Sequence, residues 1–360
     1  MRNQTYPLLL LICLLCFFSC SKENKQAQPV PKKTGPDLEK GIVNFSVNGQ
    51  VVDAVIDTTF NTITITVPED ANQHNLTVSF TLASQFTATV NGKPVSSNSA
   101  LDLSSPVDFV IASANNAATL KFRLITQNEL QYFGVGGNIL IHKSLNKNYS
   151  FYYDQWDGST YASINCGPTS STMAIKWADS TFSKKPVDAR DNIPEGGGWW
   201  STGDISTYLS ENGIKSTVDT LGNLDSLVKR TIDNNNVLIL CLDMFYVPYN
   251  ENFDEHVQKF YHTNAQGWGH FILIKGYVQL TNDFYLEAYD PYSEGMTYSV
   301  ATIGQPKGKD RYYRADDIKI ATNIWWPYAI IAAPKGQSVV AAAPLLKTKL
   351  HKPVPIAMGR

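Results

Sequence analysis

Apolar and polar residues alternate repeatedly between residues 40 and 126, and a period of two is typical of β-strands. Asn-Gly pairs at 48–49 and 91–92 interrupt the alternation and favour tight hairpin turns. Short strands separated by such turns are typical of a β-sandwich, so we predict a small all-β domain over residues 40–126. The alternating triplets are Val43, Phe45 and Val47; Ile63, Ile65 and Val67; Leu76, Val78 and Phe80; Val107, Phe109 and Ile111; and Leu120, Phe122 and Leu124.

The first 20 residues have the features of an export signal. Arg2 precedes an apolar run from Leu8 to Phe18, which is too short to span a membrane. The run is followed by Ser19 and Cys20, and this ending resembles a bacterial lipoprotein signal. The resemblance implies that residues 1–20 are a signal peptide and that Cys20 is lipidated; an ordinary secretory signal with a chance cysteine is the alternative. Residues 21–39, rich in Lys, Gln and Pro, are expected to form a flexible tether.

A lipid anchor at Cys20 implies that the chain lies at the bacterial cell envelope, held to the outer membrane and facing the periplasm or the surface. The predicted sandwich behind the tether resembles the immunoglobulin-like modules of many bacterial surface lipoproteins. That resemblance implies either a spacer or a weak binding module. The formal net charge is only -2, with acidic and basic residues spread along the chain, so charge does not point to a nucleic-acid partner.

Residues 151–335 read as a second domain, with helices first and strands later. Met173, Ala174 and Trp177 recur at helical spacing after Cys166. The order of these elements indicates an α+β domain. Residues 127–150 are expected to link the two domains, and residues 336–360 to form a disordered tail. Further helices are expected over 202–211 and 224–232, and strands over 237–244, 270–277, 284–289 and 329–332.

Cys166 begins the sequence Cys166-Gly167-Pro168-Thr169 at the predicted start of a helix. The partial positive charge at a helix N-terminus stabilises a thiolate, which is the nucleophilic form of cysteine. Beyond the signal and Cys20, the only other cysteine is Cys241, in an apolar run that predicts a buried strand. A Cys166–Cys241 disulfide is the alternative, and it would remove the nucleophile.

Three further residues complete a candidate catalytic group. His270 begins an apolar strand after Trp268 and Gly269, and Asp290 ends the next strand. Adjacent antiparallel strands could place the carboxylate beside the imidazole, where it would orient the ring and stabilise its protonated form. Gln155 lies eleven residues before Cys166, and its amide could donate to an oxyanion.

These motifs together resemble papain-like cysteine peptidases of the C-thirty-nine-like family, relatives of the bacteriocin-processing peptidases that cut after double-glycine leaders. The resemblance implies a papain-like fold in which Cys166 is the nucleophile, His270 the general base, Asp290 its orienting partner and Gln155 the oxyanion residue. Residues 245–266 look like an insertion before the histidine. The matching stretches are Tyr152 to Gln155, Cys166 to Thr169 with Met173, Gly269 to Tyr277, and Tyr289-Asp290-Pro291.

Several tryptophans and glycines flank these predicted elements and could line a substrate cleft, although core packing explains the tryptophans equally well. These residues are Trp156, Gly167, Trp199, Trp200, Trp268 and Gly269. His256 and His262, with Asp254 and Glu255 nearby, fit no common zinc spacing, so we expect neither a metal nor another cofactor.

The sequence thus favours an envelope lipoprotein whose second domain is a cysteine peptidase, with a peptide or protein as its substrate. The cleavage would pass through a thioester acyl-enzyme. Two alternatives remain. One is an amidase or transglutaminase-like acyl transferase acting on peptidoglycan or amines, and the other is a non-catalytic surface-binding protein that retains the fold.

Overall fold

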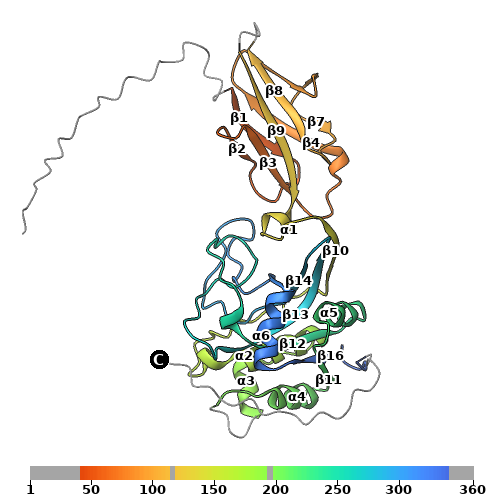
Figure 1. Ribbon diagram of the computed structural model, residues 1–360, viewed down its shortest axis with the longest axis vertical. Helices are drawn as coiled ribbons and strands as arrows, with labels where there is room; N and C mark the ends of the chain where they lie inside the picture. The colour runs from red at the N-terminus through yellow and green to blue at the C-terminus, as the bar shows by residue number, and fades with distance from the viewer. Residues whose placement is uncertain (1–40, 114–117, 193–197, 340–360) are drawn as a thin grey trace, which may run out of the picture.

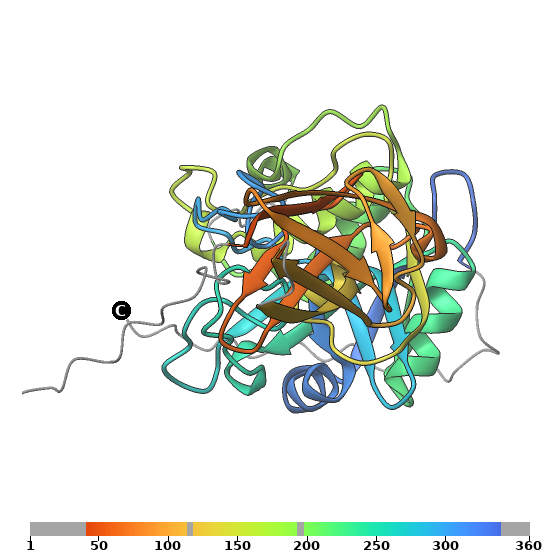
Figure 2. The same cartoon turned by 90° about the horizontal axis from the view of Figure 1, so that it is seen from above.

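A computed structural model describes residues 41–113, 118–192 and 198–339 of the 360-residue chain. An all-β domain and a mixed α and β domain follow one another along the long axis of the molecule (Figure 1). Viewed along that axis, the first domain lies over the second (Figure 2). The predicted signal peptide, the tether and nearly all of the predicted tail lie outside the described residues.

The first domain consists of two sheets that share one core, as the alternating sequence predicts. The sheets run in the orders β1-β4-β7 and β2-β3-β9-β8-β5-β6, with β3 and β9 parallel. Phe45 of one sheet packs edge-on against Phe109 of the other, with ring centroids 5.5 Å apart. The elements are β1 (Ile42–Val47), β2 (Val55–Asp57), β3 (Thr62–Val67), η2 (Gln73–Asn75), β4 (Leu76–Leu82), β5 (Phe86–Val90), β6 (Lys93–Val95), β7 (Ser99–Leu101), β8 (Val107–Ser113) and β9 (Thr119–Asn128).

The predicted alternation of buried and exposed residues is wrong at the start of β1, where Val43 was expected to face the core. Val43 is 64% exposed, whereas Ile42 and Phe45 are buried. The pairing of β1 with β4 shifts register between Ile42 and Asn44, and such a bulge turns the following side chain to the other face. The second Asn-Gly pair behaves as predicted: Asn91 and Gly92 have φ angles of 49° and 77° and join β5 to β6.

The second domain is built on a seven-stranded antiparallel sheet in the order β11-β16-β12-β13-β14-β15, with β10 also paired to β13. The strands are β10 (Ile139–Ser144), β11 (Ser216–Thr220), β12 (Val237–Asp243), β13 (Gly269–Leu280), β14 (Phe284–Tyr289), β15 (Arg311–Arg314) and β16 (Tyr328–Ala332). The helices are α1 (Glu129–Tyr132), η3 (Ala162–Ile164), α2 (Cys166–Ala178), α3 (Pro186–Ala189), η4 (Arg190–Asn192), α4 (Thr202–Glu211), α5 (Leu224–Asp233), η5 (Met244–Tyr246) and α6 (Ala315–Trp325).

Helices cover both faces of this sheet. One core cluster joins α2 and α4 to one face, and another joins α5 and α6 to the opposite face. Within β12, Ile239 belongs to the first cluster and Leu240 to the second, so the strand is buried on both sides. A strand buried on both sides reads as a continuous apolar run, which is the pattern of residues 237–242.

The segment predicted to be a linker is in part a strand of the second domain. β9 continues to Asn128, which caps α1 through its side chain, and β10 then joins the sheet beside β13. Ile139–Ser144 contains only three consecutive apolar residues and no alternation, and this run is too short for the sequence pattern to predict a strand. His142 on β10 bonds Glu69 of the first domain, with 2.5 Å between Nδ1 and Oε2. None of the helices in the described ranges has the length and apolar character needed to cross a membrane.

Candidate functional site

Cys166 is the first residue of α2, as the sequence predicts, and its side chain is buried. The preceding Asn165 does not cap the helix with its side chain; instead its Oδ1 accepts a 2.6 Å hydrogen bond from Nε of Arg190. The helix is fixed to the sheet because Ser170 Oγ donates to the carbonyl oxygen of Phe271 on β13 at 3.0 Å. This contact holds the start of α2 beside the first residues of β13.

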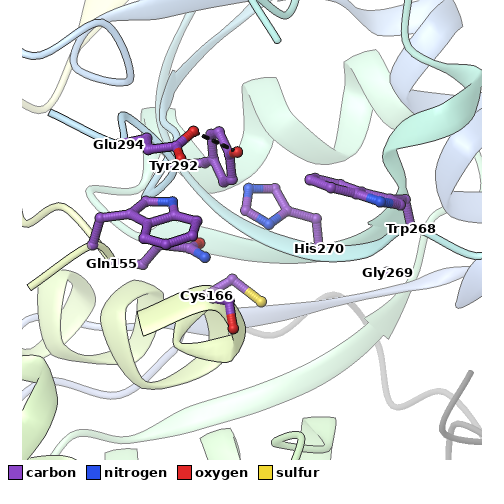
Figure 3. Close-up of a pocket in the computed structure, with 9 residues that line it drawn as sticks. Gln155, Cys166, Trp268, Gly269, His270, Tyr292 and Glu294 are labelled. Carbon is purple, nitrogen blue, oxygen red and sulfur yellow. Dashed lines mark hydrogen bonds between the residues drawn. The ribbon is translucent and has the colours of Figure 1, made fainter. Parts of the chain in front are cut away.

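His270 and Asp290 form a buried pair on neighbouring strands. His270 lies near the start of β13, Asp290 directly follows β14, and the two strands are antiparallel. His270 Nε2 lies 2.7 Å from Asp290 Oδ1, and the two side chains are 4% and 0% exposed. Since Nε2 is used by the carboxylate, Nδ1 is the ring nitrogen left to face the thiol of Cys166. Figure 3 shows the imidazole directly across from the Cys166 side chain.

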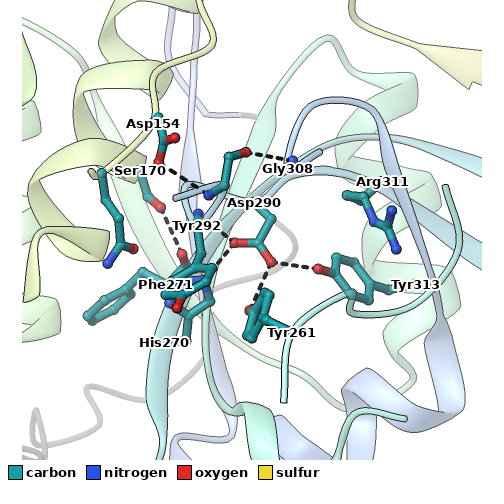
Figure 4. A network of polar contacts seen from close by, with 12 residues as sticks. Asp154, Ser170, Tyr261, His270, Phe271, Asp290, Tyr292, Gly308, Arg311 and Tyr313 are labelled. Carbon is teal, nitrogen blue, oxygen red and sulfur yellow. Dashed lines mark hydrogen bonds and ion pairs between the residues drawn. The ribbon is translucent and has the colours of Figure 1, made fainter. Parts of the chain in front are cut away.

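Asp290 receives hydrogen bonds at both carboxylate oxygens (Figure 4). Oδ1 accepts from the backbone N–H of Tyr292 at 2.9 Å as well as from His270. Oδ2 accepts from the hydroxyls of Tyr261 at 3.0 Å and Tyr313 at 2.6 Å. A buried carboxylate with this many donors is held in its charged form.

The pair shifts both pKa values towards the charged forms. Burial alone would lower the pKa of His270, but the charge and hydrogen bond of Asp290, with a further contribution from Cys166, raise it from 6.5 to about 10. Burial alone would raise the pKa of Asp290, but His270, Tyr313 and the Tyr292 N–H hold it below its usual 3.8. The ring is therefore an imidazolium at neutral pH, charged by its buried carboxylate partner.

A cavity of about 240 Å³ opens over Cys166 and His270. The remaining lining residues are Gln155, Trp156, Ser163, Trp268, Gly269, Tyr292 and Glu294. The structure thus brings together at one cavity Cys166, His270, Gln155 and three of the residues proposed for a cleft, while Asp290 lies behind the imidazole.

Gln155 reaches the cavity with its amide already in use. Nε2 donates to the carbonyl oxygen of Ala162 at 3.1 Å, and the buried Oε1 has no partner among the described residues. The second N–H of the amide is the group that could serve an oxyanion. The backbone N–H of Gln155 donates to the carbonyl oxygen of Pro291, which ties this segment to the loop after β14.

The other proposed cleft residues are placed differently. Trp200 is 5% exposed and belongs to the core cluster under α2, and Trp199 and Gly167 are likewise not among the residues that line the cavity. A Cβ on Gly167 would lie 2.8 Å from Cβ of Trp200, so this glycine allows the tryptophan to pack on the helix start. Gly167 and Trp200 therefore pack against each other at the start of α2, and none of the three residues forms the cavity wall.

Cys241 is a free, buried thiol, as is Cys166, so the alternative of a disulfide between them is not present. Burial raises the pKa of Cys241 well above its usual value, which disfavours a thiolate there. His256 is stacked between Phe133 and Tyr298, with ring centroids 3.9 and 3.8 Å away. In the described part of the chain, no group of three or more His, Cys, Asp or Glu side chains is arranged to hold a metal ion.

The sequence argument missed several residues of the site, among them the cavity-lining Ser163, Tyr292 and Glu294. Tyr261 lies in the segment 245–266 that looked like an insertion, and Tyr313 lies on β15, which the sequence did not predict. Asp243, at the end of β12, accepts hydrogen bonds from the N–H groups of Gly267 and Trp268 and so positions the turn before His270. Single polar residues in aromatic-rich segments carry no spacing signal, and only the fold brings them together.

Comparison with known proteins gives a match for the first domain. A family model described as "SGBP, N-terminal", the amino-terminal domain of surface glycan-binding proteins, matches residues 42–123. This range covers nearly all of the β-sandwich and none of the cavity described above. No curated protein matched the chain.

Three solved structures are distantly similar to this chain. A structure described as a C-thirty-nine-like peptidase from Bacillus anthracis aligns with 54% of this chain and 98% of its own, at 11% identity and a TM-score of 0.36. One described as a glycoside hydrolase from Bacteroides thetaiotaomicron aligns with 84% of this chain and 91% of its own, at 10% identity and a TM-score of 0.23. One described as a secreted protein from Bacteroides fragilis aligns with 26% of this chain and 98% of its own, at 12% identity and a TM-score of 0.21. At such scores these likenesses carry no argument about function.

Proposed function

We propose that the second domain is a papain-like cysteine hydrolase that cleaves amide bonds, with peptides as its substrates. The observation that carries the proposal is the buried His270–Asp290 pair beside a cavity that Cys166 also lines. An imidazolium charged by a buried carboxylate is the partner that an activated thiolate requires.

In this mechanism the Cys166 thiolate attacks the carbonyl carbon, a C–S bond forms, and the carbonyl oxygen becomes an oxyanion. The second amide N–H of Gln155 and the backbone N–H of Cys166 are the proposed donors to that oxyanion. The tetrahedral intermediate collapses as the C–N bond breaks, and His270 gives its proton to the leaving amine. Water then attacks the thioester, with neutral His270 accepting its proton, and this releases the acid and restores the thiolate–imidazolium pair.

Labelling of Cys166 with iodoacetamide at neutral pH tests the activated thiol. We expect the wild type to react faster than His270→Ala by roughly 10²-fold or more, since loss of the imidazolium leaves a buried thiol. Cys166→Ala should remove the label, and Cys241→Ala, the matched control at the other buried thiol, should leave it unchanged. Equal labelling rates in the wild type and His270→Ala would contradict the proposal. Turnover of peptide and of peptidoglycan fragments by the wild type then separates a peptidase from an amidase.

The family match favours a second candidate, a cell-surface glycan-binding protein without catalysis, and among the comparisons it is the stronger finding. The aromatic side chains Trp156, Trp268 and Tyr292 at the cavity are of the kind that stack on sugar rings. Isothermal titration with a panel of oligosaccharides tests this candidate. Binding that disappears in Trp268→Ala, together with His270-independent labelling of Cys166, would establish the glycan-binding function in place of the hydrolase.

Both candidates place the protein at the cell surface, and this localisation is part of the proposal. The lipoprotein-like ending at Cys20 and the match of residues 42–123 to a surface-protein family support it independently. In this arrangement the β-sandwich would hold the second domain away from the membrane.

A further inference from the structure

The cavity over Cys166 has an aromatic wall and a carboxylate at its side. Tyr292 is the central ring: its centroid lies 5.8 Å from that of Trp156 and 5.9 Å from that of Trp268. Figure 3 shows Trp268 on one side of His270, and Gln155, Tyr292 and Glu294 on the other. The Tyr292 hydroxyl donates to Glu294 Oε2 at 2.9 Å, so the carboxylate is held beside the wall.

The loop that carries Glu294 is fixed in place. One carboxylate, Asp154, accepts from the N–H groups of Trp156 at 3.1 Å, Ser293 at 3.2 Å and Gly295 at 3.2 Å. It therefore joins the wall of the cavity to the loop at its side. Glu294 itself has a φ of 51°, in the left-handed region that non-glycine residues seldom occupy. Such a conformation persists only where the surroundings hold it, and it clusters at binding sites.

The charge of the cavity is negative except at the catalytic ring. His270 is the only basic side chain among the described residues that line it, and its charge is matched by Asp290 behind it. Glu294 has no ion-pair partner within the described ranges. Aromatic rings beside an unpaired carboxylate attract an ammonium or guanidinium group through the ring faces and the opposite charge together.

We infer that this cavity selects a substrate with a cationic side chain, such as lysine or arginine, next to the bond that is cleaved. The inference rests on the proposed hydrolase and specifies its substrate class. Trp156, Tyr292 and Trp268 would cover the aliphatic stem of such a side chain, while Glu294 would pair with its charged end. Glu294 is thus a specificity-determining residue and takes no part in bond cleavage.

Quenched fluorescent peptides provide the test. In each peptide one position next to the scissile bond, either before or after it, carries lysine or its uncharged analogue norleucine. In the wild type we expect kcat/KM to favour lysine by about tenfold at one position, and the ratio to fall with added salt. Glu294→Gln should reduce the ratio to about twofold or less, because the amide keeps the hydrogen bond from Tyr292 but lacks the charge. Glu251→Gln, at an exposed carboxylate away from the cavity, should leave the ratio unchanged.

The outcomes separate this inference from the proposed function. Iodoacetamide labelling of Cys166 that depends on His270 in both the wild type and Glu294→Gln, with no preference for lysine at any position, would overturn the inference and leave the hydrolase standing. Cleavage of none of the peptides despite such labelling would overturn it as well. If the wild type and His270→Ala were labelled at the same rate, both the proposed hydrolase and this inference would be overturned. A lysine preference that persists in Glu294→Gln would show that another group recognises the charge of the substrate lysine, and would refute the role of Glu294 in selecting it.

Discussion

Replacing Asp290 with asparagine tests whether a buried ion pair with His270 stabilises the second domain. Asparagine keeps the size of the side chain and one acceptor oxygen, but it removes the charge from a site that is 0% exposed. Removal of one partner from a buried pair costs about 3–5 kcal/mol. Because an imidazole can release its proton, unlike a permanent cation, we expect a loss near the lower end, about 3 kcal/mol of unfolding free energy.

The pKa directions define the pH range in which this loss appears. The pKa of His270 is raised from 6.5 to about 10, so its contribution is complete below pH 6.5 and is lost as the pH rises towards 10. The pKa of Asp290 is lowered from 3.8, so its contribution is complete above pH 3.8 and is lost as the pH falls below that value. The difference between wild type and Asp290→Asn should therefore be largest between pH 3.8 and pH 6.5.

Urea unfolding followed by tryptophan fluorescence measures this difference for the second domain alone, because all seven tryptophans lie after residue 150. One proton corresponds to about 1.4 kcal/mol per pH unit, so a difference of about 3 kcal/mol at about pH 5.5 should be largely gone near pH 9. Asp316→Asn, at an exposed carboxylate on α6, should change stability by less than about 1 kcal/mol at both pH values. A difference that stays constant or grows with pH would refute an imidazolium–carboxylate pair.

Three further predictions concern other parts of the chain. Gly167→Ala should destabilise the second domain by about 1–3 kcal/mol and slow the labelling of Cys166, because the new Cβ would lie 2.8 Å from Cβ of Trp200. Gly136→Ala is the control and should do neither, since its Cβ would have nothing within 4 Å. Tyr313→Phe should cost about 1.5–3 kcal/mol in the same urea assay, since it removes a 2.6 Å hydrogen bond to a buried carboxylate; no change would mean that this bond does not form. Cys20→Ser should move the protein from the membrane fraction to the soluble fraction of cells, and unchanged membrane association would argue against the lipid anchor.

Much of the second domain follows from the sequence, because its elements have strong local signals. Helices α4 and α5 begin at the predicted residues 202 and 224, and the structure shows a side-chain cap before each: Ser201 accepts from the N–H of Asp204, and Asn223 from that of Ser226. The continuous apolar run in β12 predicts a strand covered on both faces. The antiparallel pairing of β13 with β14 then places Asp290, the residue after β14, beside the imidazole of His270, as the positions of the two residues on adjacent predicted strands suggested.

The sequence predicts less where contacts alone determine the structure. β10 lacks alternation because it lies between two domains and contacts both, through His142 with Glu69 and Glu287. Val43 is exposed because of a bulge in β1, and the local sequence contains no pattern that predicts this bulge. In the same way, the aromatic segment 245–266 resembled an insertion, yet its Tyr261 donates a hydrogen bond to the carboxylate of Asp290. Long-range contacts of this kind produce no periodic pattern of apolar residues in the sequence.

The surroundings of Asp290 also change what a substitution there should mean. If the residue only oriented the ring, one acceptor oxygen would suffice, and an asparagine would serve as well as an aspartate. Here two tyrosine hydroxyls donate to the second oxygen, which is not bonded to His270. An asparagine would present an N–H₂ group to those hydroxyls, and an N–H₂ group cannot accept the hydrogen bonds that they donate to the carboxylate. The arrangement of four donors is therefore matched to a charge, and it links the segment 245–266 and β15 to the chemistry of His270.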